Sequence, residues 1–216
     1  MLRKVFVLCG LLFVLIVLSG CMKEEPMPQI VYGAPSVIVP PKAAPLPKQP
    51  TRLDLGTSGG WIPPAYLEKG WTAIVIHHSG TPKGNAAIFD EWHKEGRHWE
   101  GVGYDFVIGN GTDSSDGEIE PTFRWWQQKV GAHCGGTPGN WANVDGIGIC
   151  LVGDFNHTYP TSRQMQSLSQ LVRFLESRYK IPKSRIYGHN TTPGASGKTD
   201  CPGRNFPMYR LKSMVD

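Results

Sequence analysis

The stretch Trp71-Thr72-Ala73-Ile74-Val75-Ile76-His77-His78 decides the fold of this chain. Its run of β-branched residues is typical of a buried strand, and the strand is expected to end at the polar pair His77-His78. A second run, Ile147-Gly148-Ile149-Cys150-Leu151-Val152, is apolar at almost every position. Continuous apolar runs indicate strands that are buried on both faces. The two stretches therefore predict a sheet with other elements packed on both sides.

The remaining elements alternate between strands and helices. Strands are predicted at 103–108 and 185–188, and helices at 85–95, 161–180 and 206–214. Thr161 and Gln164 form a capping box at the start of the longest helix, and Gly96 is expected to end the first one. If the adjacent Trp125 and Trp126 lie in a strand, only one of them faces inward. Interleaved strands and helices predict an α/β fold class, with a central mixed β-sheet flanked by helices on both faces.

The N-terminal residues carry a targeting pattern. Arg3 and Lys4 precede an uncharged, mostly apolar run at 5–18, which is too short to span a bilayer and is typical of a secretory signal. The run ends in Leu18-Ser19-Gly20-Cys21, which resembles the bacterial lipoprotein processing box. The resemblance implies a signal peptide at 1–20 and a lipidated Cys21 that attaches the protein to a membrane. A buried helix, or an uncleaved anchor with a chance cysteine, is the alternative.

These features predict a location in the cell envelope, with the protein anchored to a membrane by lipid. Met22 rather than Asp follows the cysteine, which by analogy favours the periplasmic side of the outer membrane if the cell is Gram-negative. Eight prolines between Pro26 and Pro50 predict a semi-extended Pro-rich linker at 21–59. The folded domain is therefore expected at 60–216.

Composition excludes several classes of protein. Hydrophobic residues make up 40% of the chain and charged residues 19%, which excludes a disordered chain and a coiled coil. The net charge of +4 gives no strong case for binding to nucleic acid, so no nucleic-acid partner is expected. We also expect a monomer. Processing at Cys21 would leave three thiols in the folded part, Cys134, Cys150 and Cys201.

Three potential metal ligands, His77, His189 and Cys201, stand at predicted strand ends or in the loops that follow them. Two imidazoles and one thiolate leave one tetrahedral position of a zinc ion open, which is the arrangement of a catalytic rather than a structural site. Such a site activates water and polarises a carbonyl group. The two histidines are 112 residues apart, so their spacing alone is a weak signal.

Six short motifs occur in one order along the chain. Each of them alone is a weak signal, but the six in this order are a strong one. They are Ile74-Val75-Ile76-His77-His78-Ser79, Gly103-Tyr104-Asp105-Phe106, Gly131-Ala132-His133, Ile147-Gly148-Ile149, Gly188-His189 and Thr199-Asp200-Cys201-Pro202-Gly203. Their order resembles the zinc-dependent N-acetylmuramoyl-L-alanine amidase and peptidoglycan-recognition-protein family, in particular its phage-lysozyme-like amidase branch. The resemblance covers about residues 70–210. It implies the fold of that family and a Zn²⁺ cofactor bound by His77, His189 and Cys201.

The resemblance also implies the catalytic groups. Tyr104 would be one of them, because a tyrosine at this place acts in the phage-lysozyme-like and recognition-protein members. Thr199, with Lys198 beside it, would hold the oxyanion. The loop that precedes them is longer than in several relatives, so which of the two faces the carbonyl stays open. In the branch of the family that uses a glutamate as base, the glutamate follows Ile-Gly-Ile. This chain has Cys150 at that position, so the resemblance favours Tyr104 as the catalytic group.

Two further residues are assigned to substrate binding. His133 matches a family histidine near the groove, and a supporting role or a solvent-facing loop position are its alternatives. Trp126 would stack on sugar rings, or else it packs under a loop. His78 is expected to pack or to form a hydrogen bond rather than to bind metal.

The implied function is that of a peptidoglycan hydrolase. It would cleave the amide bond between N-acetylmuramic acid and L-alanine of the stem peptide with zinc-activated water, and its partners would be peptidoglycan or muropeptides. A non-catalytic peptidoglycan-binding recognition module is the alternative, although members of that kind commonly lack the cysteine ligand. A cysteine peptidase that uses Cys201 or Cys150 is a third interpretation. Cys150 is expected to be a buried, inert thiol, and its pairing with Cys134 stays open.

Overall fold

A computed structural model of the chain describes residues 58–215. The predicted signal peptide at 1–20, Cys21 and nearly all of the linker at 21–59 lie outside the described residues. Lipidation, attachment to a membrane and location in the envelope therefore stay predictions, as do the domain boundaries. Within the described part, no helix combines the length and the apolar character needed to cross a bilayer.

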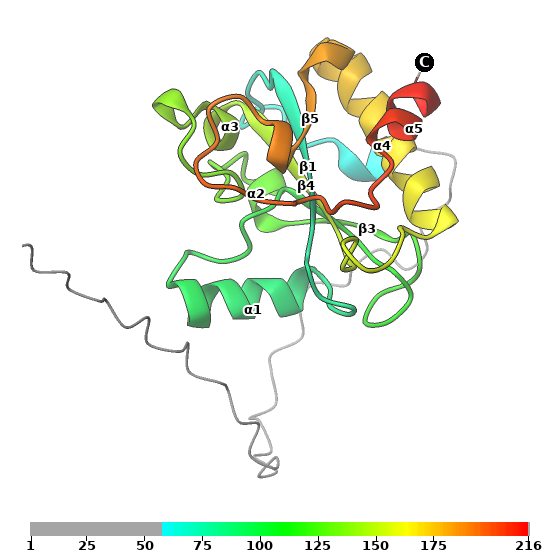
Figure 1. Cartoon of the computed structure of the whole chain (residues 1–216). Helices are drawn as coiled ribbons and strands as arrows, with labels where there is room; N and C mark the ends of the chain where they lie inside the picture. The colour runs from blue at the N-terminus through cyan, green and yellow to red at the C-terminus, as the bar shows by residue number, and fades with distance from the viewer. Residues whose placement is uncertain (1–57, 216) are drawn as a thin grey trace, which may run out of the picture. The chain divides into compact units, whose positions relative to one another are not determined.

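A five-stranded sheet forms the centre of the domain, in the order β3-β2-β4-β1-β5 (Figure 1). The strands are β1 (Ala73–His78), β2 (Phe106–Ile108), β3 (Ile119–Pro121), β4 (Gly146–Leu151) and β5 (Ile186–Gly188). β1 lies parallel to both β4 and β5, and β2 lies parallel to β4. Only the edge strand β3 runs antiparallel, to β2. The mixed sheet that the sequence predicts is confirmed.

Helices cover both faces of this sheet. They are α1 (Ala86–Arg97), α2 (Phe123–Trp126), α3 (Trp141–Val144), α4 (Ser162–Tyr179) and α5 (Met208–Met214). The long helix α4 lies beside α5 on one side, while α1 lies on the other side of the sheet (Figure 1). The α/β fold class with flanking helices is therefore confirmed.

Alternation along β1 separates the two faces, because successive side chains of a strand point to opposite sides. Ile74 and Ile76 belong to the large apolar core that α4 and α5 cover. Val75 faces the opposite side, where it packs with Cys134 and Ala142. By the same alternation His77 lies on the side of Val75, and so it faces away from the core under α4.

Three short elements were not predicted, namely β3, α2 and α3. They have only three or four residues each, which is too few to show a period in the sequence. Trp125 and Trp126 lie in the short helix α2 rather than in a strand. Trp125 is fully buried, whereas Trp126 is 37% exposed, so one ring still faces inward.

The expected end of α1 at Gly96 is wrong by a small margin. Gly96 lies inside the helix, and α1 continues to Arg97. His98 takes the left-handed conformation, with φ of 56°, and its N–H donates to the carbonyls of His93 and Lys94. The last turn of α1 thus tolerates a glycine, and His98 adopts the sterically unfavourable left-handed conformation that ends the helix.

Candidate active site

Parallel pairing brings the potential metal ligands together. The carboxyl ends of β1 and β5 lie at the same edge of the sheet, because the two strands are parallel neighbours. His77 is near the end of β1, and His189 directly follows β5. Cys201 comes from a later loop that is tied to this edge, since the Asn190 N–H donates to the Cys201 carbonyl at 2.7 Å.

The three side chains fit a zinc ion. One ligand atom of each of His77, His189 and Cys201 can be chosen so that all lie within 4.8 Å of one another. His77 Nδ1 lies 3.5 Å from Cys201 Sγ. Zinc bonds of about 2.1 Å to nitrogen and 2.3 Å to sulfur, at a tetrahedral angle, place such atoms about 3.5 Å apart. The three side chains therefore lie close enough together to share one metal ion.

Burial keeps both imidazoles neutral, as metal ligands must be. His77 is 1% exposed, and desolvation, with the nearby His133 and His189 rings adding to it, holds its pKa well below the usual value. Burial also lowers the pKa of His189. Both rings can therefore offer a lone pair at neutral pH.

The Cys201 thiol needs a cation to ionise here. Burial raises its pKa to about 12, so a thiolate forms only when a positive charge, such as a bound divalent metal, compensates for the lost hydration. Cys150 is fully buried, and desolvation raises its pKa well above the usual value. Neither thiol is an activated nucleophile, which argues against a cysteine peptidase.

The remaining thiols and His78 have structural surroundings. Cys134 and Cys150 are free, so the open alternative of a disulfide between them is not realised. His78 Nδ1 accepts a hydrogen bond from the Phe155 N–H at 3.0 Å, and the two rings lie 5.9 Å apart. His78 thus packs and forms a hydrogen bond, as the sequence predicts, and is not part of the ligand cluster.

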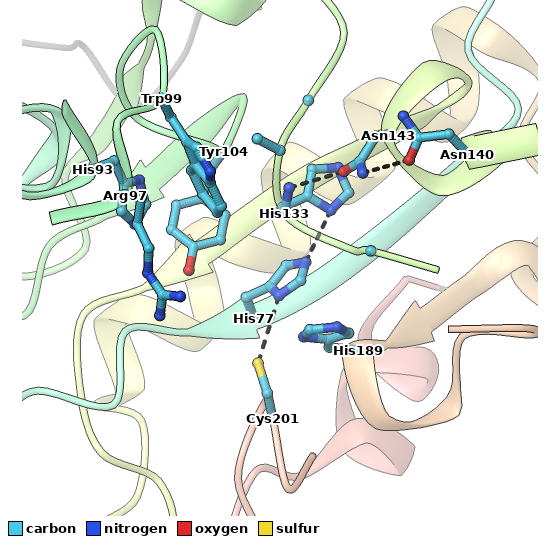
Figure 2. A pocket seen from close by; sticks show the side chains of 13 residues that line it. His77, His93, Arg97, Trp99, Tyr104, His133, Asn140, Asn143, His189 and Cys201 are labelled. Atoms are coloured by element: carbon cyan, nitrogen blue, oxygen red, sulfur yellow. Dashed lines mark hydrogen bonds between the residues drawn. The ribbon is translucent and has the colours of Figure 1, made fainter. Parts of the chain in front are cut away.

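A cavity of about 540 Å³ is lined in part by His77, His189 and Cys201. Tyr104 lines it, and the Tyr104 ring centroid lies 5.2 Å from that of His77. Figure 2 shows the Tyr104 hydroxyl directed into this cavity. Desolvation, with the Cys150 and Cys201 sulfurs adding to it, raises the pKa of Tyr104 well above the usual value. The phenol therefore stays protonated and is a hydrogen-bond donor in the lining of the cavity.

The sequence analysis missed several lining residues, among them Asn140 and Asn143 and three residues in or just after α1. His93 and Arg97 come from the last turns of α1, and Trp99 follows them. The His93 ring lies 5.8 Å from Tyr104 and 5.0 Å from Trp99, and the Arg97 guanidinium lies 6.0 Å from the Trp99 ring. No motif marks them. Their one signal is the spacing of four residues between His93 and Arg97, which puts both on one face of a helix.

His133 lines the cavity but is almost completely buried. It is 7% exposed, and its Nδ1 lies 3.1 Å from His77 Nε2. Burial lowers the pKa of His133 to about 3. The ring is thus neutral and in contact with a potential metal ligand. Its assignment to substrate binding stays a prediction.

The other assigned residues lie outside this lining. Thr199 Oγ1 accepts a hydrogen bond from the Cys201 N–H at 3.1 Å, which leaves its hydroxyl hydrogen available. Lys198 is exposed. Trp126 is not among the residues that line the cavity, and Trp99 is the tryptophan that does. The roles predicted for Lys198, Thr199 and Trp126 stay predictions.

Comparison with known proteins agrees with this geometry. The family described as N-acetylmuramoyl-L-alanine amidase, Amidase_2, matches residues 68–204. The chain belongs to this family. The match includes all three potential zinc ligands together with Tyr104 and His133.

Individual relatives are distant. The chain is 27% identical over 143 residues to peptidoglycan-recognition protein 2 of Holotrichia diomphalia, covering 60% of this chain and 70% of that one. It is also 27% identical over 143 residues to a human N-acetylmuramoyl-L-alanine amidase, of which it spans only 22%. Among solved structures, the N-acetylmuramoyl-L-alanine amidase LysC of Clostridium intestinale is similar, with a TM-score of 0.57 and 33% identity over 68% of this chain and 85% of that one. The relatives thus include both amidases and recognition proteins.

Proposed function

We propose that this protein is a peptidoglycan hydrolase that cleaves the amide bond between N-acetylmuramic acid and L-alanine of the stem peptide. The observation that carries the proposal is the complete cluster of His77, His189 and Cys201 in the lining of a cavity. Three protein ligands are what a catalytic zinc site needs, since the fourth position is left to water or substrate. The likeness to the amidase LysC, at 33% identity, supports the same reaction.

The residues of the site would have different roles in this reaction. Zinc held by the three ligands would polarise the amide carbonyl and lower the pKa of water. His77 and His189 contribute neutral nitrogen ligands, and the Cys201 thiolate reduces the charge of the site to +1. Tyr104 keeps its proton, because burial raises its pKa, and its hydroxyl donates a hydrogen bond to the carbonyl oxygen as negative charge develops there. We keep Thr199 and Lys198 as further candidates for holding that oxygen.

A recognition module without catalysis is the second candidate, and the recognition protein of Holotrichia diomphalia among the relatives favours it. Such a module would use the cavity to bind muropeptides and would need no metal. The presence of Cys201 within reach of His77 and His189 favours catalysis over this candidate.

Digestion of purified muropeptides, followed by mass spectrometry, tests the proposal. The full chain with zinc is expected to release stem peptides that begin with L-alanine, and a chelator is expected to stop the release. Cys201→Ala should lose bound zinc and activity by more than about 100-fold, which is the upper end of what removing a mere supporting partner costs. Cys134→Ala is the matched control, because Cys134 is a buried thiol outside the ligand cluster. Intact muropeptides that bind tightly to a zinc-free protein would instead support the recognition module.

We also propose that Cys21 carries lipid and holds the protein at a membrane of the cell envelope. The processing pattern before Cys21 supports this. Cys21→Ser is expected to shift the protein from the membrane fraction to the soluble fraction of a bacterial host. Unchanged fractionation of Cys21→Ser, with no lipid on the wild-type protein by mass spectrometry, would contradict it.

A further inference from the structure

The two ring nitrogens of His77 face different partners. Nδ1 lies 3.5 Å from Cys201 Sγ, on the side where the potential ligands meet. Nε2 lies 3.1 Å from Nδ1 of His133. Figure 2 shows the His77 ring between the His133 ring and the Cys201 sulfur. One nitrogen therefore serves the candidate metal site, and the other serves a second histidine.

The contact of the second histidine with the backbone fixes where the protons lie. His133 Nε2 lies 3.3 Å from the Gly146 carbonyl oxygen. A carbonyl can only accept, so His133 Nε2 carries a hydrogen and, in a neutral ring, His133 Nδ1 is an acceptor. His77 must then donate from Nε2, which leaves the lone pair of a neutral His77 on Nδ1. Among the described residues no carboxylate forms a hydrogen bond with either ring.

The His133 ring is held in place from several sides. A β-carbon at Gly148 would lie 2.3 Å from His133 Cδ2, and one at Gly131 would lie 2.7 Å from the same atom. Only glycine leaves room for the imidazole at these two positions. The backbone N–H of His133 donates to Asn143 Oδ1 at 2.8 Å, and the neighbouring Cys134 N–H donates to the same oxygen. The ring therefore has one position against β4, with its Nδ1 toward His77.

We propose that His133 is a positioning residue that fixes the tautomer and orientation of His77. The Gly146 carbonyl holds His133 Nε2–H, His133 Nδ1 accepts from His77 Nε2–H, and His77 Nδ1 is thereby presented to the metal. The inference rests on the proposed zinc site, and it assigns His133 a role toward the ligand rather than toward the substrate. Partners of this kind orient metal-binding histidines, and losing one typically lowers metal affinity about 10- to 100-fold.

Zinc affinity, measured on the full chain by competition with a chromophoric chelator, tests the proposal without relying on activity. His133→Leu removes the acceptor and is expected to weaken zinc binding about 10- to 100-fold. His133→Asn keeps an oxygen acceptor at the position of Nδ1 and is expected to recover most of that loss. His157→Leu, on an exposed histidine bonded to Asp154, is the matched control and should bind zinc as the wild type does.

The outcomes separate this inference from the proposed function. If the wild type binds zinc and His133→Leu binds it equally well, the positioning role is wrong. Equal losses in His133→Leu and His133→Asn would also overturn it, since shape rather than the hydrogen bond would then matter. A wild type that binds no zinc would contradict the zinc amidase itself.

A second measurement needs no variant to fold. In the zinc-loaded wild type with ¹⁵N-labelled histidine, long-range nitrogen–proton spectra are expected to show His77 bound to the metal through Nδ1 and protonated at Nε2. His133 is expected to be neutral and protonated at Nε2. A His77 that binds zinc through Nε2, or a His133 protonated at Nδ1 alone, would refute the proposed chain of hydrogen bonds.

Discussion

Ile74 and Ile76 point to one face of the sheet, and Val75 and His77, on the same strand, point to the other. The first face meets α4 and α5 in a core of large apolar side chains. The second face carries small apolar clusters, the side chains of His133 and Tyr104 in contact with His77, and a cavity. The first face therefore supplies most of the stability, whereas the second face has less apolar packing and holds the candidate site.

A substitution that creates a cavity under α4 should lower stability and leave the candidate site unchanged. Leu168 of α4 is fully buried in the large core, so Leu168→Ala is expected to lower the free energy of unfolding by about 2–5 kcal/mol. Zinc affinity and turnover per folded molecule should stay unchanged. Urea denaturation of the full chain checks the stability, and active-site-normalised kinetics check the turnover. Gln166→Ala, at an exposed position of α4, is the control and should change stability by less than about 0.5 kcal/mol.

If Leu168→Ala instead lowered turnover per folded molecule as much as it lowered stability, the faces would not be independent. The core under α4 would then hold the geometry of the site directly. The assignment of stability to the first face and of the candidate site to the second would have to be given up.

The complementary change is made in the cavity. Tyr104→Phe removes one hydroxyl while keeping the ring that packs against His77 and His93. Losing a preorganised donor to a developing oxyanion lowers turnover about 100-fold or more, and we expect that loss with unchanged zinc affinity and stability. Tyr159→Phe, on a side chain that is 73% exposed, is the matched control. Turnover that stays within about threefold of the wild type would remove Tyr104 from the catalytic groups, since a donor is worth far more.

The two faces also differ in how far the sequence predicts them. The elements that build the first face, which α4 and α5 cover, could be predicted from local sequence patterns. β1 and β4 are continuous apolar runs, and α4 begins after Thr161 with the predicted capping box. These signals are strong because each lies within one element. The short β3, α2 and α3 gain their geometry from contacts with the rest of the fold, and their three or four residues carry no period.

The site face could be predicted only where a motif marks a residue. His77, His189 and Cys201 stand in such motifs, and the parallel pairing of β1 with β5 places them together. Arg97 and Trp99 reach the cavity through the way α1 packs on the sheet, which no spacing in the sequence shows. The contact between His77 and His133 joins residues 56 positions apart, so its hydrogen bond could be found only in three dimensions.

The smallest expected effect concerns Asp105, a buried carboxyl beside the face of the sheet that carries His77 and the cavity. It is fully buried, its Oδ2 accepts from the Gly148 N–H at 2.8 Å, and its Oδ1 has no hydrogen-bond partner among the described residues. Desolvation raises its pKa from 3.8 to about 7, although the Gly148 N–H, Lys69 and Arg124 act in the opposite direction. A raised pKa in the folded state means that the fold favours the neutral carboxyl over the ionised one.

The sign of the pH dependence follows from proton binding. Below pH 3.8 the carboxyl is protonated in both states, and above about pH 7 it is ionised in both. Between these values the unfolded chain loses its proton while the folded chain keeps it, so stability falls as pH rises, by up to about 1.4 kcal/mol per pH unit. Asp105→Asn mimics the neutral carboxyl and cannot ionise, so it should lack this contribution. Its stability relative to the wild type is therefore expected to increase from pH 4 to pH 7 and then to level off.

Urea denaturation of the full chain in chelator, at steps of pH, measures this difference without metal binding. Other titrating groups are common to the wild type and Asp105→Asn, so their effects cancel when the two curves are subtracted. Asp113→Asn, at an exposed position, is the control and should follow the wild-type curve. Parallel curves for Asp105→Asn and the wild type would mean that the carboxyl is not held neutral. The site face would then carry no stability cost at Asp105, and its difference from the core under α4 would lie in packing alone.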